Sequence, residues 1–160
     1  MTNREKSKPD TPAVHIPPPV IVTVFLLAGL GLDYFISNTF GDALSWLKYV
    51  GVGLVVFGFS IALWCAFLYR KSKTSILPHT ADSHMIETGP FGWSRNPIYL
   101  SMLLVFIGIC LFADAPVALL FIIPTYFALR YYVISREEAY LTRRFGAEYT
   151  SYQTRVRRWI

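Results

Sequence analysis

The sequence predicts an all-α, polytopic membrane protein that forms a single domain over residues 1–160. Hydrophobic residues make up 54% of the chain and charged residues only 16%, whereas about a quarter of the residues in a soluble domain are charged. The apolar residues gather in long runs that short polar stretches separate. We therefore expect about four transmembrane helices, followed by a C-terminal amphipathic helix.

Four apolar runs qualify as transmembrane helices. In chain order they are residues 20–36, 49–69, 97–113 and 115–134. The second run is uncharged and long enough to cross a hydrocarbon layer of about 30 Å as a helix. The third and fourth runs are short for a full crossing, which leaves open whether both of them span the bilayer.

The ends of these runs carry local signals. A polar tail, residues 1–16, leads through three prolines into the first run. No small-x-small cleavage site follows that run, so we interpret it as a retained helix and not as a signal peptide. Only Asp114 and Pro116 punctuate the last two runs, which predicts a tight helical hairpin. Pro124 should kink the fourth helix, because proline lacks an amide hydrogen and crowds the preceding turn.

The basic residues predict the orientation. With four crossings, the N-terminal tail, the loop over residues 70–96 and the C-terminal tail share one side. Every lysine and arginine except Lys48 lies in these segments or, for Arg130, at the adjoining end of the fourth run. The positive-inside rule therefore places this side in the cytoplasm, with the helices in the cell inner membrane. Topology and anionic lipid explain the net charge of +5, which disfavours nucleic acid as a partner.

The two cysteines do not indicate a chemical site. Cys65 and Cys110 both lie inside apolar runs, and the sequence has neither a CxxC motif nor a Cys/His cluster. The sequence therefore predicts neither a disulfide framework nor a bound metal. Nothing in the sequence indicates an obligate protein partner.

The C-terminal tail carries an apolar stripe with a spacing of three or four residues. Its members are Leu141, Phe145, Tyr149, Tyr152 and Val156. The spacing predicts an amphipathic helix, and an interfacial helix held by arginines on anionic lipid would account for it. That interpretation does not account for Glu137 and Glu138, which stand where the fourth helix leaves the membrane. Two roles stay open for this acidic pair: a salt bridge with Arg136 or Arg130, or recognition of a ligand's ammonium or ribose hydroxyls.

Residues 89–100, GPFGWSRNPIYL, form a rigid polar segment before the third helix. Gly89 and Pro90 predict a fixed turn whose backbone can approach a ligand closely. Asn96 precedes a proline and is expected to be extended, and Pro97 suits the first position of a helix. Taken alone, the segment is a loop-to-helix entry. Its combination with the acidic pair, one helical hairpin later, favours a ligand site.

These motifs together resemble a superfamily of membrane methyltransferases, the isoprenylcysteine carboxyl methyltransferases and phospholipid N-methyltransferases. The family pattern is G-x-[YF], then R-[HN]-P-x-Y, then E-E-x-x-L-x-x-x-F-G-x-x-Y-x-x-Y. Residues 89–91, 95–99 and 137–152 match it in order and spacing, and residues 74–79 resemble the T-x-x-x-P-H stretch of prokaryotic members. The resemblance covers residues 65–160, and the first two helices carry no motif.

The resemblance implies an integral membrane methyltransferase that uses S-adenosyl-L-methionine. Its substrate would be a lipophilic small molecule or a lipidated molecule that enters from the membrane lipid. By motif position, the implied cofactor-binding residues are His84, Met85, Ile86, Gly89, Phe91, Asn96, Pro97, Tyr99 and Glu137. The candidate substrate-binding residues are Arg95, Arg130 and Glu138. No catalytic residue is assigned; His79 and His84 are the candidates if a base is required.

Two positions depart from the eukaryotic carboxyl methyltransferases. Those enzymes have a histidine before the proline and an arginine one turn before the acidic pair, where this chain has Asn96 and Val133. Arg130 lies one turn earlier still. The methyl acceptor is therefore open among a carboxylate, a thiol, an amine and a lipid head group. No His/Asp dyad is visible in the sequence, which favours an acceptor that is already nucleophilic.

The alternative function is a small four-helix membrane transporter or scaffold without catalysis. A proton-coupled carrier is expected to place an ionisable residue deep within a helix. Only Asp33 is a candidate, and it lies near the outer end of the first run. Because the polar residues concentrate on one side instead, the sequence favours the enzyme.

Overall fold

A computed structural model describes residues 12–36, 39–71 and 85–160, and every regular element within these residues is helical. The α-helices are α1 (Pro18–Ile36), α2 (Leu47–Lys71), α3 (Pro97–Phe112), α4 (Pro116–Leu120), α5 (Ile122–Ala128), α6 (Ser135–Phe145) and α7 (Ala147–Arg155). Short 3₁₀ helices cover Asp42–Leu44 and Gly89–Gly92, and a π-helical stretch covers Leu129–Ile134. The predicted all-α fold is confirmed. His79, His84, residues 74–79 and most of the N-terminal tail lie outside the described residues.

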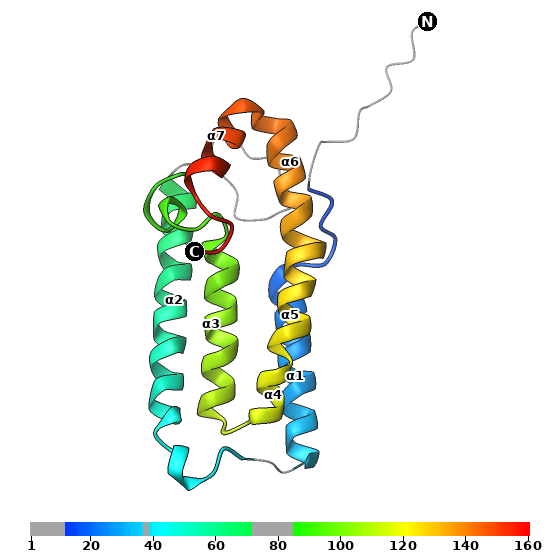
Figure 1. The fold of residues 1–160 in the computed structure, drawn as a ribbon, viewed down its shortest axis with the longest axis vertical. Coiled ribbons are helices and arrows are strands. Elements are labelled where there is room, and N and C mark those ends of the chain that lie inside the picture. Colours follow the sequence, from blue (N-terminus) through cyan, green and yellow to red (C-terminus); the bar gives the residue numbers. More distant parts are fainter. Residues whose placement is uncertain (1–11, 37–38, 72–84) are drawn as a thin grey trace, which may run out of the picture.

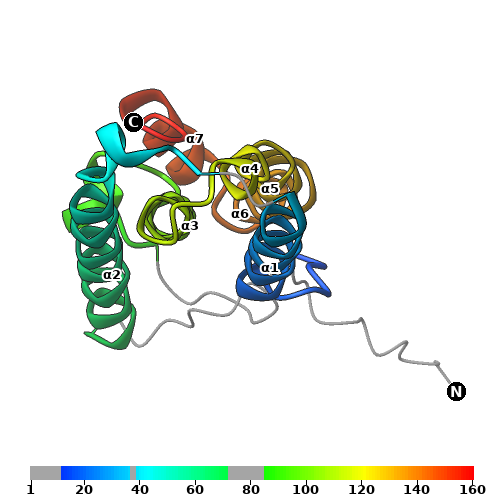
Figure 2. The same ribbon diagram turned by 90° about the horizontal axis from the view of Figure 1, so that it is seen from below.

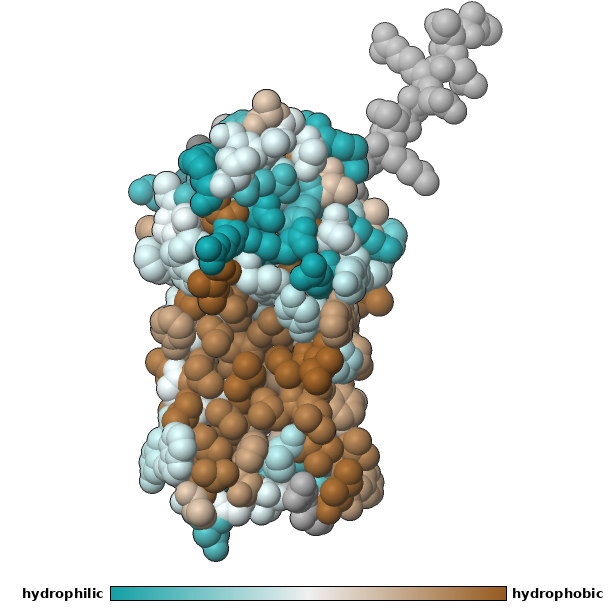
Figure 3. Space-filling model, viewed as in Figure 1, coloured by the Kyte–Doolittle hydropathy of each residue, from teal (hydrophilic) through white to brown (hydrophobic). Residues whose placement is uncertain are grey.

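The long helices stand side by side, with α6 and α7 at one end of the bundle (Figure 1). Seen along the bundle, α3 lies between α2 on one side and α1 with the α4–α6 column on the other (Figure 2). On the face seen in Figure 3, hydrophobic side chains cover the middle of the molecule, and hydrophilic side chains gather at the end that carries α6 and α7. This distribution is that of a polytopic membrane protein.

Three stretches of the described chain are long and apolar enough to cross a membrane. They are Pro18–Ile36, Asp42–Lys71 and Pro116–Phe145, and Pro97–Phe112 is a shorter apolar helix. With only 16 residues, α3 is short for a full span of about 20 residues, as the sequence predicts.

The fourth helical segment runs further than the sequence predicts. Instead of ending at Ile134, it continues through the π-helical stretch into α6 and ends at Phe145. A π turn takes up more residues than an α turn, so it changes the direction in which the following side chains point. The predicted kink is present, because regular helix breaks at Phe121. Pro124 has no amide hydrogen to donate to the carbonyl of Leu120 one turn earlier.

The C-terminal tail is helical, but as two helices and not one. The chain turns at Gly146, whose φ of 54° is readily available to glycine, and α7 folds back from that point. Tyr149, Tyr152 and Val156 are buried, and they pack against Met85, Leu141 and Phe145. This half of the apolar stripe therefore contacts protein, and not lipid as an interfacial helix would.

Glycines bring the backbones of α2 and α3 together. A Cβ atom added at Gly51 would lie 2.6 Å from the carbonyl oxygen of Gly108, and one added at Gly108 would lie 2.7 Å from that of Gly51. One added at Gly58 would lie 2.9 Å from the carbonyl oxygen of Ser101. Small residues of this kind allow the close backbone approach that stabilises helix pairs in a bilayer.

Two aspartates fasten the opposite end of the bundle. The buried Asp33 of α1 accepts hydrogen bonds from the backbone amides of Val117 (2.8 Å) and Ala118 (3.4 Å) in the first turn of α4. Asp114, in the predicted hairpin turn, accepts one from the amide of Phe40 at 3.0 Å. A carboxylate at a helix N-terminus satisfies amides that have no partner within the helix.

Candidate functional site

The two motifs that the sequence pairs are in direct contact. Tyr99, in the first turn of α3, donates a hydrogen bond from its hydroxyl group to Oε1 of Glu137 in α6, at 2.6 Å. Such a short distance is typical of a hydroxyl group bonded to a carboxylate. Tyr99 is buried and Glu137 is partly exposed. The entry of α3 and the acidic pair therefore form one polar site at the end of the bundle.

Glu138 binds two arginines that come from different parts of the chain. Arg158 donates to both of its carboxylate oxygens, from Nε at 3.0 Å and from Nη2 at 2.6 Å. Nη2 of Arg95 lies 3.2 Å from Oε1 of the same carboxylate. The hydrogen bonds to Glu138 raise the pKa of Arg158 above its usual value. The two arginines make Glu138 a structural link between the α3 entry, α6 and the end of the chain.

The nearby arginines that the sequence offers as salt-bridge partners make other contacts. Arg136 donates to the backbone carbonyl of Ala13 at 3.1 Å and lies over the ring of Tyr132. Arg130 donates to the hydroxyl of Tyr126 at 3.0 Å. The arginines that bind Glu138 thus come from a loop and from the chain end, which are distant in sequence.

The last residues of the chain run along the loop before α3. The backbone amide of Arg95 donates to the carbonyl of Arg157 at 3.0 Å. The side-chain Nδ2 of Asn96 donates to the carbonyl of Arg158 at 2.9 Å. The chain end therefore continues the site by backbone contacts as well as through the ion pair.

Two further contacts extend this attachment toward α7. Tyr152 donates a hydrogen bond from its hydroxyl group to the carbonyl of Phe91 at 2.7 Å, and Arg155 pairs with Glu87 at 2.7 Å. We call residues 152–159 the C-terminal strap. Apart from Tyr152, which ends the last family motif, no sequence motif marks the strap as part of the site, and its arginines are equally well explained by anionic lipid.

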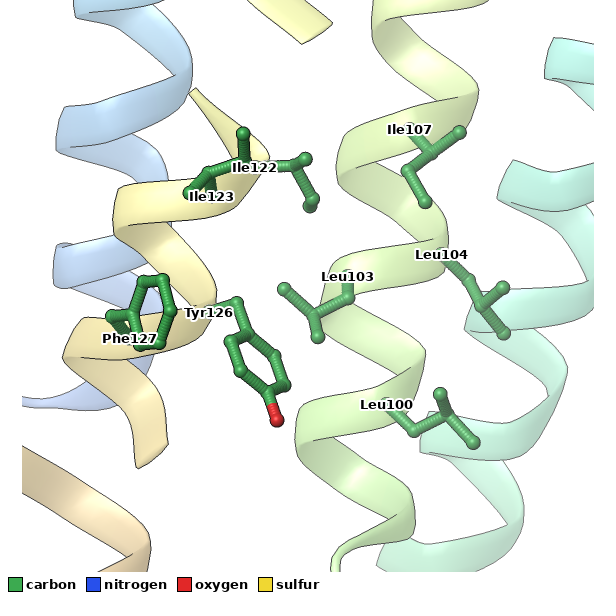
Figure 4. Close-up of a pocket in the computed structure, with 8 residues that line it drawn as sticks. All are labelled: Leu100, Leu103, Leu104, Ile107, Ile122, Ile123, Tyr126 and Phe127. Carbon is green, nitrogen blue, oxygen red and sulfur yellow. The ribbon is translucent and has the colours of Figure 1, made fainter. Parts of the chain in front are cut away.

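A groove lined by apolar side chains lies between α3 and α5, below the polar site. Its volume is about 440 Å³. The residues that line it are Leu100, Leu103, Leu104, Ile107, Ile122, Ile123, Tyr126 and Phe127 (Figure 4). Leu100 directly follows Tyr99, so the groove ends at the polar site.

One lining residue, Tyr126, belongs to an aromatic pair. The ring of Trp159, from the C-terminal strap, packs against the ring of Tyr126 with 5.3 Å between centroids. Arg130, from the π-helical stretch, donates to the hydroxyl of the same tyrosine. Neither aromatic residue belongs to a recognised motif, so sequence reasoning missed both.

Comparison with known proteins decides the family. Residues 46–148 match the model of the phospholipid methyltransferase family, which is more than half of the chain. The chain belongs to the phospholipid methyltransferase family. The matched region starts near the beginning of α2 and includes the α3 entry and the acidic pair, so the predicted resemblance is confirmed.

Individual relatives match parts of this family member. An uncharacterized protein of Haemophilus influenzae is 38% identical over 63 residues, which are 39% of this chain and 100% of that protein. The nickel-cobalt-cadmium resistance protein NccN of Alcaligenes xylosoxydans xylosoxydans is 28% identical over 138 residues, 86% of this chain. The protein-S-isoprenylcysteine O-methyltransferase of Saccharomyces cerevisiae is 35% identical over 79 residues, 48% of this chain. The matches span 59% of NccN and 32% of the yeast protein. No solved structure matches significantly.

In this phospholipid methyltransferase family member, several predicted cofactor residues contact protein. Phe91 is buried against Ile61 and Cys65 of α2. Gly89 has the positive φ (61°) that the predicted turn requires, but a Cβ atom added there would meet the side chains of Leu68 and Trp64. The close approach at this glycine is therefore made by α2.

The remaining predicted residues surround the α3 entry. Pro97 is the first residue of α3, as predicted. Asn96 is less extended than predicted, with φ −129° and ψ 50°. Met85 packs against the cluster of Tyr149, Tyr152 and Val156, and Ile86 packs against the cluster of Ile61, Cys65 and Phe91.

Two buried tyrosines lie beside the ion pairs. Burial raises the pKa of Tyr149 to about 12, and the charge of Glu138 raises it further while Arg95 opposes the shift. Burial likewise raises the pKa of Tyr152. Both phenols are therefore neutral at physiological pH. Among the residues that the structure describes, no three His, Cys, Asp or Glu side chains group to hold a metal ion.

Proposed function

We propose that this chain is an integral membrane methyltransferase that binds S-adenosyl-L-methionine at its polar end and methylates a lipophilic acceptor. The observation that carries the proposal is the contact between Tyr99 and Glu137, which joins two family motifs beside the end of the apolar groove. A site for a polar cofactor and a site for a hydrocarbon chain are thereby adjacent. Family membership supports methyl transfer as the chemistry.

The residues present fit this cofactor. The carboxylate of Glu137 suits an ammonium group or ribose hydroxyls, and the ring of Tyr99 suits a sulfonium cation or adenine. The side chain of Arg95 is largely buried, and its Nε has no hydrogen-bond partner among the described residues. The carboxylate of S-adenosylmethionine is a suitable acceptor for this N–H. His84, which the family resemblance adds to the site, lies outside the described residues.

The chain's own task is to position the acceptor and exclude water. S-adenosylmethionine supplies a methyl group on a sulfonium sulfur, which is already a good leaving group. The groove would orient the acceptor by its hydrocarbon part, and the C-terminal strap would cover the site from solvent. A carboxylate or thiolate acceptor needs no base, and the described part of the site offers no histidine that could serve as one.

We also infer that the polar end faces the cytoplasm across the inner membrane. Arg70 lies in the last turn of α2, and Arg143 and Arg144 lie in the last turn of α6. Both of these helix ends are at the polar end of the bundle, whereas Lys48 lies in the first turn of α2, at the other end (Figure 1). The positive-inside rule then sets the orientation. A cysteine introduced at the exposed Arg144 should be labelled by an impermeant maleimide only after the cells are opened. Labelling in intact cells would reverse the assignment.

The structure weakens the alternative of a transporter. Asp33, the ionisable residue that the sequence offers for ion coupling, caps α4 with two hydrogen bonds near the outer end of the bundle. A carboxylate engaged in this way has a structural role. The concentration of polar contacts at the opposite end supports a binding site there.

Cofactor binding by the purified protein tests the proposal. Isothermal titration should show binding of S-adenosylmethionine to the parent and binding about tenfold to a hundredfold weaker to Glu137→Gln. Glutamine still accepts a hydrogen bond from Tyr99, so the melting temperature without cofactor should stay the same. Glu148→Gln, at an exposed position in α7, is the matched control and should bind like the parent. A parent protein that does not bind the cofactor would refute the proposed function.

A further inference from the structure

Trp159 has a hydrogen-bond donor that lacks an acceptor. Its indole Nε1 is buried and has no hydrogen-bond partner among the described residues. A buried N–H without a partner is unfavourable, so native structures rarely keep one without a reason. The ring lies on Tyr126, which lines the groove between α3 and α5. The donor is therefore beside the polar end of the groove.

The chain end bridges the two helices that form the groove. The hydrogen bond from Asn96 to the carbonyl of Arg158 fixes the strap at the start of α3. The next residue, Trp159, packs on Tyr126 of α5. These two attachments join the strap to the start of α3 and to α5, the two helices that line the groove.

The polar groups at this end are mainly donors. The hydroxyl oxygen of Tyr126 accepts a hydrogen bond from Arg130, which leaves its own hydrogen to donate. Neither carboxylate at this end is left for the amphiphile's head group, because Glu137, which accepts from Tyr99, is assigned to the cofactor in the proposed function and Glu138 is paired with arginines. A phenol O–H, an indole N–H and a guanidinium charge together match an anionic oxygen and disfavour an ammonium group.

We propose that the groove binds the hydrocarbon chain of an amphiphile whose anionic head-group oxygen accepts a hydrogen bond from the indole of Trp159. This proposal rests on the proposed function, in that the amphiphile is the methyl acceptor. The apolar lining of the groove suits the chain (Figure 4). The helices that line it, α3 and α5, lie in the part of the molecule whose surface is hydrophobic (Figures 1 and 3). Trp159 is then a residue that determines head-group specificity.

Competition binding in nanodiscs of zwitterionic lipid tests the proposal. Radiolabelled palmitate is the reporter, and hexadecyl phosphate and hexadecyltrimethylammonium are the competitors with the same chain length. The parent should bind palmitate and hexadecyl phosphate in preference to the ammonium compound. The relative affinity of the two anions distinguishes a carboxylate head group from a phosphate.

The key variant is Trp159→Phe, which keeps an aromatic ring on Tyr126 but has no N–H. It should bind the anionic amphiphiles about tenfold more weakly, with binding of the ammonium compound unchanged. Tyr126→Phe removes the second donor and should act in the same direction. Trp93→Phe, at an exposed tryptophan in the loop before α3, is the matched control and should bind like the parent.

The outcomes separate this inference from the proposed function. If Trp159→Phe and Tyr126→Phe bind the anions as tightly as the parent, or if the parent prefers the ammonium compound, the inference is wrong. Binding of S-adenosylmethionine is measured on the same preparations. A parent that binds the cofactor but shows no head-group preference refutes the inference alone. The expected preference without cofactor binding refutes the proposed function and leaves an amphiphile site.

Discussion

The α2–α3 contact and the polar cap, which we define as residues 85–99 and 136–159, are held together in different ways. Between α2 and α3, glycines let the two backbones approach until no Cβ atom would fit. In the cap, side chains from three segments are joined by hydrogen bonds and ion pairs, with Glu138 between Arg95 and Arg158.

The difference follows from the surroundings of each region. Within a bilayer, lipid is as apolar as the side chains, so helices associate by close packing and small residues allow it. At the membrane surface, polar groups can be buried only if they find partners. The α2–α3 contact leaves no room for a ligand. The polar cap has hydrogen-bond donors without a partner among the described residues, such as Nε of Arg95, which a ligand can use. A binding site is therefore expected in the cap.

The largest effect is expected from a change in the close helix contact. Gly108→Ala would place a Cβ atom 2.7 Å from the carbonyl oxygen of Gly51, and backbone atoms cannot rotate away. We expect a loss of about 2–3 kcal/mol of unfolding free energy, typical of an overpacked core. Reversible unfolding in mixed micelles measures it.

The matched control for this prediction lies in the same helix pair. Gly53 of α2 has no heavy atom within 4 Å of an added Cβ. Gly53→Ala should be neutral or stabilise by up to about 1 kcal/mol, because alanine favours a helix more than glycine does. Equal stability of the two variants would contradict close packing as the basis of the α2–α3 contact.

A smaller effect is expected from the central carboxylate of the cap. Glu138→Gln would leave Arg95 and Arg158 without their shared counter-charge. Because Arg158 is 36% exposed, water compensates in part, and we expect a loss of about 1–2 kcal/mol. Thermal unfolding without ligand measures it.

Comparison with Glu137→Gln distinguishes the roles of the two adjacent glutamates. Glu137→Gln should leave the thermal stability unchanged and lower cofactor affinity, the reverse of the pattern at Glu138. If Glu138→Gln unfolds like the parent, the arginines are held by other contacts and the cap does not depend on this carboxylate.

Sequence reasoning succeeded where the signals are local. The apolar runs located the helices, Pro97 marked the start of α3, and Pro124 marked the irregularity in the fourth segment. The proximity of the α3 entry and the acidic pair also followed, because a hairpin returns the chain to the same end of a bundle. Tyr99 and Glu137 meet there.

Sequence reasoning failed where a pattern does not show which surface or residue its side chains contact. The stripe that ends at Tyr152 and Val156 is equally suited to lipid and to a protein surface, and the structure places these residues against protein. The arginine stripe could not show that Arg158 binds Glu138, since those residues meet only after the chain turns at Gly146. The cofactor and substrate roles of the site residues stay predictions.

The smallest effect is expected from the pH dependence of the cap. Burial raises the pKa of Tyr149 to about 12 from an ordinary value of 10. The folded protein therefore holds the phenolic proton more tightly than the unfolded chain does. The stabilisation of the folded protein is fully present below pH 10 and is lost as the pH rises toward 12. The loss of unfolding free energy reaches about 1 kcal/mol by pH 11.

The melting temperature of the parent should fall further between pH 9 and pH 11 than that of Tyr149→Phe, which has no phenolic proton. Every other titrating group is present in both proteins, so the difference between their pH profiles belongs to Tyr149 in the cap. Identical pH profiles would show that Tyr149 is not buried in the folded cap.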